Sequence, residues 1–186
     1  MEDIQKLRTF NKLKSVYRAN SVENRKESSA EHSWSSLMLA DYFLSKFNYD
    51  LDKLKVYELL MYHDLVEIKS GDFPLDPTQE HKNKREIEEK VAREISKDIP
   101  EILSEKYLEL FKEFEECNSK EAKFAKAIDK LDAEIHEMDY KEDWKGWSKE
   151  FLIKNKLEYF NEFPEMEQMF YDLLEFFETN GYFDQN

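Results

Sequence analysis

Turn-forming residues are scarce in this chain. Only three glycines and four prolines occur among its 186 residues, whereas Leu, Glu, Lys, Ala and Phe are abundant. A sheet of many strands needs glycine, proline and similar residues at its frequent turns. The sequence therefore predicts an all-α fold.

The chain has the length of one ordinary domain, long enough to bury most of the surface that its unfolded form would expose. No internal repeat, low-complexity linker or shift in composition marks a boundary. We expect a single helical bundle over residues 1–186, with a central part over about 28–140 and C-terminal helices over about 148–179.

Apolar periodicity and capping residues predict where the helices lie. Ser28 and Glu31 form a capping-box pattern, and Asn118 with Glu121 forms another. Asp50 is a candidate cap for the helix between them that carries a long apolar run. The expected helices are 3–14, 28–46, 50–69, 78–97, 100–117, 118–138, 148–161 and 164–179, and residues 16–27 are expected to form a polar loop.

The charge balance and the cysteine content limit the partners and the compartment. A net charge of −14 opposes attraction to nucleic acid polymers and to anionic membranes, so we expect neither as a partner. A single cysteine, Cys117, excludes an intrachain disulfide framework. Neither a signal-peptide pattern nor a run of roughly 18 apolar residues occurs. We expect a cytoplasmic protein that acts on a small molecule.

Two adjacent titratable residues, His63 and Asp64, interrupt the apolar run from Leu59 to Val66. Burying such side chains without partners costs several kcal/mol, and a bound metal ion would satisfy both at once. The alternative is a core histidine that is hydrogen-bonded to a carbonyl, which would be favoured for an isolated histidine. Two neighbouring polar interruptions are harder to satisfy by chance hydrogen bonds, so the doublet favours a metal site.

His32 and Asp129 are candidate ligands from distant segments. His32 falls in the first turn of an expected helix, and small alanines near Asp129 would permit close approach of another helix. Taken alone, His32 could be an exposed first-turn residue and Asp129 part of a solvated acidic face. The spacing leaves these alternatives open, although two histidines and two aspartates would make a plausible divalent-cation site.

Together these residues resemble the H…HD…D signature of HD-domain metal-dependent phosphohydrolases. Three longer segments carry the resemblance: ESSAEHS at 27–33, HDLVEIKSGD at 63–72 and AKFAKAIDKL at 122–131. They are similar to the branch that contains bacterial 5'-deoxynucleotidases and their eukaryotic relatives. The resemblance covers about residues 3–140, and the segment that follows carries no motif of the family.

The resemblance implies that His32, His63, Asp64 and Asp129 bind one divalent cation in a metal-site core over about 28–140. A mixed nitrogen and oxygen set suits Mn, Co, Fe, Ni or Zn better than Mg. Such a cation polarises a phosphoryl group and acidifies a water molecule, so the implied chemistry is metal-assisted hydrolysis of a phosphate ester.

The resemblance also assigns roles to three further residues. Glu67 matches a carboxylate near the attacking water, to which we give the acid/base role, and Asp72, after the turn at Gly71, matches a carboxylate in the substrate pocket. These two assignments could be reversed. Arg18 matches a phosphate-binding arginine, with a loop cap or a carboxylate pair as the alternative. The bacterial relatives have tryptophan directly after this arginine, where this chain has Ala19.

The predicted function is a nucleotidase that hydrolyses (deoxy)nucleoside 5'-monophosphates. One alternative is an HD hydrolase of a nucleoside triphosphate, cyclic nucleotide or alarmone, for which Arg25, Lys82, Lys84 and Arg85 are available cations. Another is a non-enzymatic helical interaction module. A ferritin-like di-iron bundle is set aside because the chain lacks paired Glu-x-x-His motifs.

The family often forms homodimers, so a homodimer is one expectation. Aromatic side chains of the C-terminal helices could supply its interface or complete the monomer core. His81 and His136 are expected at the surface, and Trp144 and Trp147 are expected to pack as structural residues. The C-terminal aromatic residues in question are Phe160, Phe163, Phe170, Tyr171, Phe176 and Phe177.

Overall fold

The computed structural model describes residues 1–78 and 83–184. Within these ranges the chain is mainly helical, and the strands form one two-stranded antiparallel sheet. The expected all-α class is therefore confirmed, with a single hairpin added to it.

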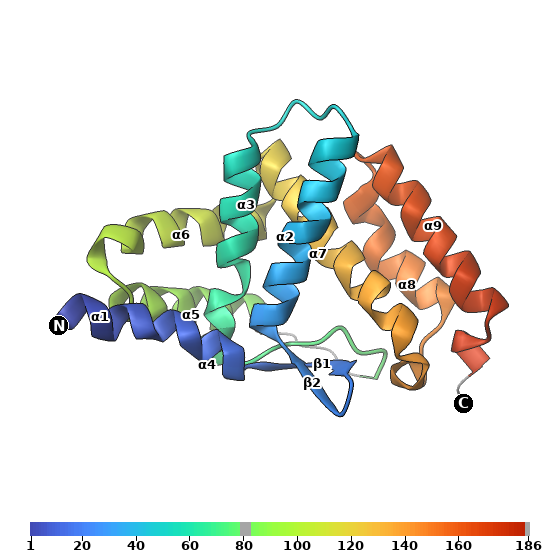
Figure 1. Ribbon diagram of the computed structural model, residues 1–186, viewed down its shortest axis with the longest axis horizontal. Helices are drawn as coiled ribbons and strands as arrows, with labels where there is room; N and C mark the ends of the chain where they lie inside the picture. Colours follow the sequence, from blue (N-terminus) through green and yellow to red (C-terminus); the bar gives the residue numbers. More distant parts are fainter. Residues whose placement is uncertain (79–82, 185–186) are drawn as a thin grey trace.

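Helix α7 (Lys120–His136) lies at the centre of the molecule (Figure 1). It packs against α2 (Ser29–Lys46) and α3 (Lys53–Tyr62), which also pack against each other. Helices α5 (Lys84–Asp98) and α6 (Glu101–Glu116) lie on one side of this trio, and α8 (Lys149–Lys156) and α9 (Pro164–Thr179) lie on the other. Segments far apart in the sequence therefore meet around α7.

Shorter elements connect these helices. They are α1 (Glu2–Leu7), a 3-10 helix (Arg8–Ser15), β1 (Tyr17–Val22), β2 (Arg25–Ser28), a 3-10 turn (His63–Val66), α4 (Glu67–Ser70) and 3-10 turns at Glu137–Asp139, Lys141–Trp144, Leu157–Phe160 and Tyr182–Asp184.

Side-chain caps fix the starts of several helices. The Ser28 and Glu31 capping box is present at α2, as expected. The residue before α3 is Asp52, whose side chain accepts a hydrogen bond from Lys55 N, so the expected cap at Asp50 is wrong by two positions. Ser119 caps α7, so the expected cap at Asn118 is wrong by one position. A cap must directly precede the first turn to reach its free N–H groups.

Four expected elements differ from the structure. Residues 16–27 do not form a loop, because β1 and β2 pair with each other here. Tyr17 lies opposite Ser28, and Val22 lies opposite Arg25. The expected helix 50–69 is interrupted by the 3-10 turn that begins at His63, and the first helix continues after Leu7 only as a 3-10 helix. Helix α5 begins at Lys84, and part of the expected 78–97 lies outside the described residues.

The hairpin escapes prediction because it lacks the apolar alternation of an ordinary strand. The turn of the hairpin is made at Glu23, which has a positive φ of 51°. Farther along, Gly71 ends α4 with a φ of 75°, a value that glycine adopts without a steric penalty. This glycine allows the chain to leave α4 sharply and to carry Asp72 toward the site described below.

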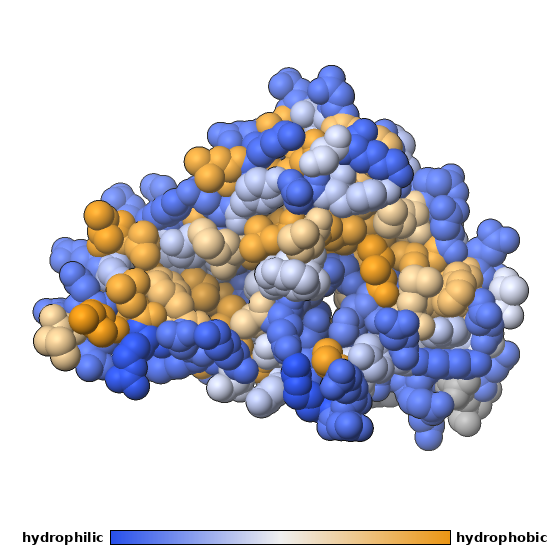
Figure 2. Space-filling model, in the orientation of Figure 1, coloured by the Kyte–Doolittle hydropathy of each residue, from blue (hydrophilic) through white to orange (hydrophobic). Residues whose placement is uncertain are grey.

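The hydrophobic core runs from Leu13 to Tyr182 and includes side chains of α2, α3, α5, α6, α7 and α9. Phe160, Phe163, Phe170 and Phe177 are fully or nearly fully buried, so these aromatic residues complete the core of the chain. Large apolar side chains remain exposed on α1, α2 and α3, and Figure 2 shows hydrophobic residues across the middle of the face that carries these helices. None of the described helices is long and apolar enough to cross a membrane.

Candidate functional site

Three of the four expected metal ligands come together where α2, α3 and α7 meet. His32 lies in the first turn of α2, His63 directly after α3 and Asp129 in the middle of α7. Their ligand atoms all lie within 4.8 Å of one another, and all three side chains are buried. His32 is therefore not an exposed first-turn residue, and Asp129 does not belong to a solvated face.

The Nδ1 atom of each histidine ring lies within hydrogen-bond distance of a protein oxygen. His32 Nδ1 lies 2.8 Å from Asp132 Oδ2, and the same oxygen accepts a hydrogen bond from Ser35 Oγ. His63 Nδ1 lies 2.7 Å from Leu60 O. Since a carbonyl only accepts, Nδ1 of His63 carries the hydrogen and its Nε2 presents a lone pair. Hydrogen bonds of this kind orient the histidine ligands of metal sites.

Asp64 lies beside the three-residue cluster. Its Oδ1 is 3.1 Å from His63 Nε2, so an acceptor oxygen faces an acceptor nitrogen. Within the described residues, neither His63 Nε2 nor Asp64 Oδ2 has a hydrogen-bond partner. Two buried acceptors at this distance repel each other unless a cation neutralises them. This donor set fits a divalent metal ion.

Charges within the cluster shift the ionisation of its members. Burial and the positive charge of Arg18 lower the pKa of His32, but the hydrogen bonds to Asp129 and Asp132 outweigh them and raise it to about 10. Burial raises the pKa of Asp129, but Lys130 and the two histidines hold it well below the ordinary value. Burial lowers the pKa of His63. His63 is thus neutral, the form of imidazole that binds metals, whereas His32 keeps a proton between Asp129 and Asp132 that a bound metal ion would displace.

Two further carboxyl groups face the cluster. Ser29 Oγ donates a 2.6 Å hydrogen bond to Glu67 Oε2. Burial, Asp64 and Asp72 raise the pKa of Glu67 well above its ordinary value. Burial also raises the pKa of Asp72, as does Asp64, whereas Arg18 opposes the shift. The structure therefore gathers carboxyl groups whose negative charges disfavour one another.

Arg18 lies on β1 at the edge of this cluster. Its Nε is 3.1 Å from Glu27 Oε2, and its Nη1 is 3.9 Å from Asp64 Oδ2. Burial lowers the pKa of Arg18, but Asp64 and Asp72 outweigh burial and raise it, so the guanidinium stays charged. The expected alternative, a pair with a carboxylate, is present, and the same side chain also faces the cluster.

A cavity of about 1370 Å³ connects these residues with the C-terminal part of the chain. Arg18, His63, Asp64, Glu67, Asp72 and Asp129 all line it. From the C-terminal part, Trp147, Phe151 and Tyr159 also line it. The cavity exceeds the usual volume of a small-molecule site, roughly 300–1,000 Å³.

Several residues of the site were not expected from the sequence. Asp132 holds His32, and Lys130 Nζ lies 3.0 Å from Asp129 Oδ2. Asp132 could have been found because it follows Asp129 by three residues and shares its helix face. Asn20 and Glu137, which also line the cavity, are 117 residues apart and gave no signal in the sequence.

The tryptophans and the other two histidines match their expected positions only in part. Trp144 is buried against Phe177, as expected for a structural residue, and both Trp144 and Trp147 line the cavity. His136 is not a free surface residue, because its ring is partly buried and its Nε2 lies 2.7 Å from Ser21 O. His81 and Lys82 lie outside the described residues.

Known proteins are similar to this chain in sequence and in fold. The model of the HD domain matches residues 10–167. The 5'-deoxynucleotidase HDDC2 of Homo sapiens is 31% identical over 144 residues, which cover 75% of this chain and 68% of the relative. The protein of the same name from Bos taurus is 28% identical over 142 residues, with the same two coverages.

Solved structures share the fold. A crystal structure from Magnetospirillum magnetotacticum, described as a predicted metal-dependent phosphohydrolase, aligns with a TM-score of 0.86 at 24% identity and covers 97% of this chain and 93% of its own. A conserved hypothetical protein from Pyrococcus furiosus aligns with a TM-score of 0.64 at 27% identity, over 89% of this chain and 99% of its own. The chain therefore belongs to the HD-domain family.

Proposed function

We propose that the chain is a metal-dependent nucleotidase that hydrolyses (deoxy)nucleoside 5'-monophosphates to nucleoside and phosphate. The observation that carries the proposal is the pair of facing acceptors, His63 Nε2 and Asp64 Oδ1, beside His32 and Asp129 at the wall of a large cavity. The names of the relatives support the choice of a nucleotide monoester.

In this proposal His32, His63, Asp64 and Asp129 hold one divalent cation. When bound, the cation would polarise the phosphoryl group and lower the pKa of a water molecule. Two imidazole nitrogens among the donors favour Mn, Co, Fe, Ni or Zn over Mg.

The side chains around the cluster bind the phosphate and move the proton. Arg18 stays charged and would donate its N–H groups to phosphate oxygens. Glu67 Oε2 is already held by Ser29, which leaves Oε1 to exchange a proton with the reacting groups. Because burial raises the pKa of Glu67, this carboxyl is suited to hold a proton and to deliver it to the departing 5'-oxygen. Asp72 would position the substrate at the turn after Gly71.

The other candidate cations support a monoester over a polyphosphate. Arg25 is exposed and pairs with Glu31, and Arg85 pairs with Glu89 on the outer face of α5. Lys84 lines the cavity, and its Nζ lies 3.6 Å from Glu88. A longer phosphate chain would have to compete with these acidic partners. The large cavity volume favours a hydrolase of a bulkier phosphate ester as the second candidate.

The test measures phosphate release by metal-stripped protein to which Mn, Co, Ni, Zn or Mg is added in turn. The substrates are deoxyribonucleoside and ribonucleoside 5'-monophosphates, a nucleoside triphosphate and a cyclic nucleotide. We expect metal-dependent release of orthophosphate from the monophosphates, and loss of both metal and activity in Asp64→Ala. Asp139→Asn, an exposed carboxylate near the end of α7, is the control.

Each other outcome of this test has a distinct meaning. Pyrophosphate release from the triphosphate would favour the second candidate. Retention of metal without cleavage of any phosphate ester would contradict the nucleotidase. Absence of both metal and activity would favour a non-enzymatic interaction module.

Three further proposals come from the sequence. We propose that residues 1–186 form one domain, which the continuity of the hydrophobic core from Leu13 to Tyr182 supports. We also propose a cytoplasmic location and a homodimer. Exposed apolar side chains on α2 and α3, such as Trp34 and Leu54, are a better candidate interface than the buried C-terminal phenylalanines.

A further inference from the structure

Asn20 and Glu137 form a polar pair that lines the cavity at the end of α7, away from the cluster of His32, His63 and Asp129. Asn20 Nδ2 donates a 2.5 Å hydrogen bond to Glu137 Oε1, and both side chains line the cavity. Glu137 is 8% exposed, and its second oxygen, Oε2, has no hydrogen-bond partner among the residues that the structure describes. Buried carboxyl oxygens normally have partners, so this oxygen points to a ligand.

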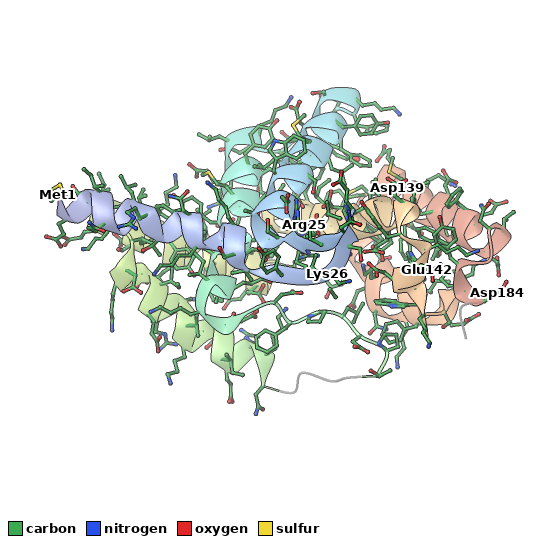
Figure 3. All side chains as sticks on the ribbon, turned by 60° about the horizontal axis from the view of Figure 1, so that its bottom comes forward. Met1, Arg25, Lys26, Asp139, Glu142 and Asp184 are labelled. Atoms are coloured by element: carbon green, nitrogen blue, oxygen red, sulfur yellow. The ribbon has the colours of Figure 1, made fainter. Side chains whose placement is uncertain are left out.

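The surrounding structure holds this pair in place. Trp144 Nε1 donates to Glu137 O, and Ser21, next to Asn20, binds Asp143 through its backbone N–H and its hydroxyl. Figure 3 shows the hairpin, with Arg25 and Lys26, lying beside the segment that carries Asp139 and Glu142. A side-chain pair fixed from both sides can discriminate between ligands, because it cannot turn away to satisfy a wrong one.

Two elements of the fold set the distance between this pair and the metal cluster. Asp129, Ala133 and Glu137 follow one another along one side of α7 and its extension, and all three line the cavity. The rise of a helix places Glu137 about 12 Å beyond Asp129. On β1, Arg18 and Asn20 are two residues apart, about 7 Å along the strand, and both line the cavity.

This spacing matches an extended nucleotide. With its phosphate at Arg18 and the metal cluster, the sugar would lie beside the small side chain of Ala133 and the base would reach Glu137. We propose that Glu137, held by Asn20, is a specificity-determining residue that accepts a hydrogen bond from an amino group of the nucleobase. This inference rests on the proposed nucleotidase function and adds a substrate preference to it.

The substrates dCMP and dUMP give the sharpest test, because the pyrimidine of one carries an amino group where the other carries a carbonyl. Burial raises the pKa of the Glu137 carboxyl to about 8, so the assay is buffered above that value, where both oxygens only accept. We expect the wild-type protein to prefer dCMP in kcat/KM by about tenfold or more.

Glu137→Gln should invert this preference. Asn20 would still donate to the amide oxygen, so the amide nitrogen of the new side chain takes the place of Oε2 and donates to the carbonyl of dUMP. Glu142→Gln makes the same chemical change at an exposed position outside the cavity and should keep the wild-type ratio. If Glu137→Gln does not fold, Asn20→Ala, which frees the carboxyl, should reduce the dCMP preference.

Equal kcat/KM for dCMP and dUMP in the wild-type protein would overturn the proposal, as would an unchanged ratio in Glu137→Gln. If no monophosphate is cleaved, the nucleotidase function has failed, and calorimetry with deoxycytidine and deoxyuridine then tests Glu137 separately. Tighter binding of deoxycytidine, inverted in Glu137→Gln, would support the base site without the hydrolysis. Equal binding of the two nucleosides would overturn the base site.

Discussion

The two ends of the cavity are built in different ways. At the metal cluster, His32, His63 and Asp129 are placed by the packing of three helices in the centre of the core. At the far end, Asn20 and Glu137 are placed by hydrogen bonds between a hairpin and a 3-10 turn. The first end therefore depends on the fold as a whole, whereas the second depends on a few side chains. Substitutions at the far end should change selectivity while those at the cluster change catalysis.

The largest effect is expected at the cluster. Asp129→Asn removes a negative donor from the metal site, so metal content should fall and kcat/KM should decrease by about a thousandfold. Metal analysis and initial rates check this, with Asp139→Asn as the exposed control. Full activity with normal metal content would show that Asp129 is not a ligand.

A loss of stability with little change in chemistry is expected at the buried ion pair between α7 and α8. Lys156 Nζ lies 2.6 Å from Glu134, and both side chains are buried. Lys156→Met would leave Glu134 buried without its cation and should lower the free energy of unfolding by about 3 kcal/mol. Chemical denaturation measures this, and Lys154→Met, an exposed lysine of α8, should leave stability unchanged. A larger effect on kcat than on stability would contradict the comparison.

Replacing the carboxyl group of Glu67 by an amide should slow the proton transfer. Glu67→Gln keeps the size of the side chain but removes its acid/base function, so kcat should fall by about a hundredfold at unchanged metal content. Metal analysis separates this role from that of a ligand. Loss of the metal in this variant would instead make Glu67 a ligand.

The smallest effect concerns the pH dependence of stability at the far end. Burial, with Asp143, raises the pKa of Glu137 from 4.5 to about 8 in the folded protein. The raised pKa stabilises the folded protein fully below pH 4.5, and this stabilisation is lost as pH rises through about 8. Relative to Glu137→Gln, the free energy of unfolding of the wild type should therefore fall as pH rises across this range. Thermal unfolding at several pH values checks this, and parallel curves for the two proteins would refute it.

The sequence predicts those site residues that belong to a recognisable local pattern. The doublet His63 and Asp64 is visible because it interrupts an apolar run, and the box at Ser28 marks the turn that carries His32. The hairpin is invisible because its inner face lines a polar cavity and therefore carries no apolar alternation. The contact between Asn20 and Glu137 depends on tertiary structure alone, since no local pattern links residues so far apart.

The interruption of the helix at His63 has a consequence for the carboxyl groups that follow it. In a regular α-helix, residues three apart are offset around the axis by about 60°. In a 3-10 turn, such residues are eclipsed. Asp64 lies in this tightened turn and Glu67 follows it, so their two carboxyl groups stand closer to the same side of the backbone than they would in a continuous α-helix. Burial raises the pKa of Glu67, and the nearby charge of Asp64 raises it further, so the backbone itself helps to prepare Glu67 as an acid.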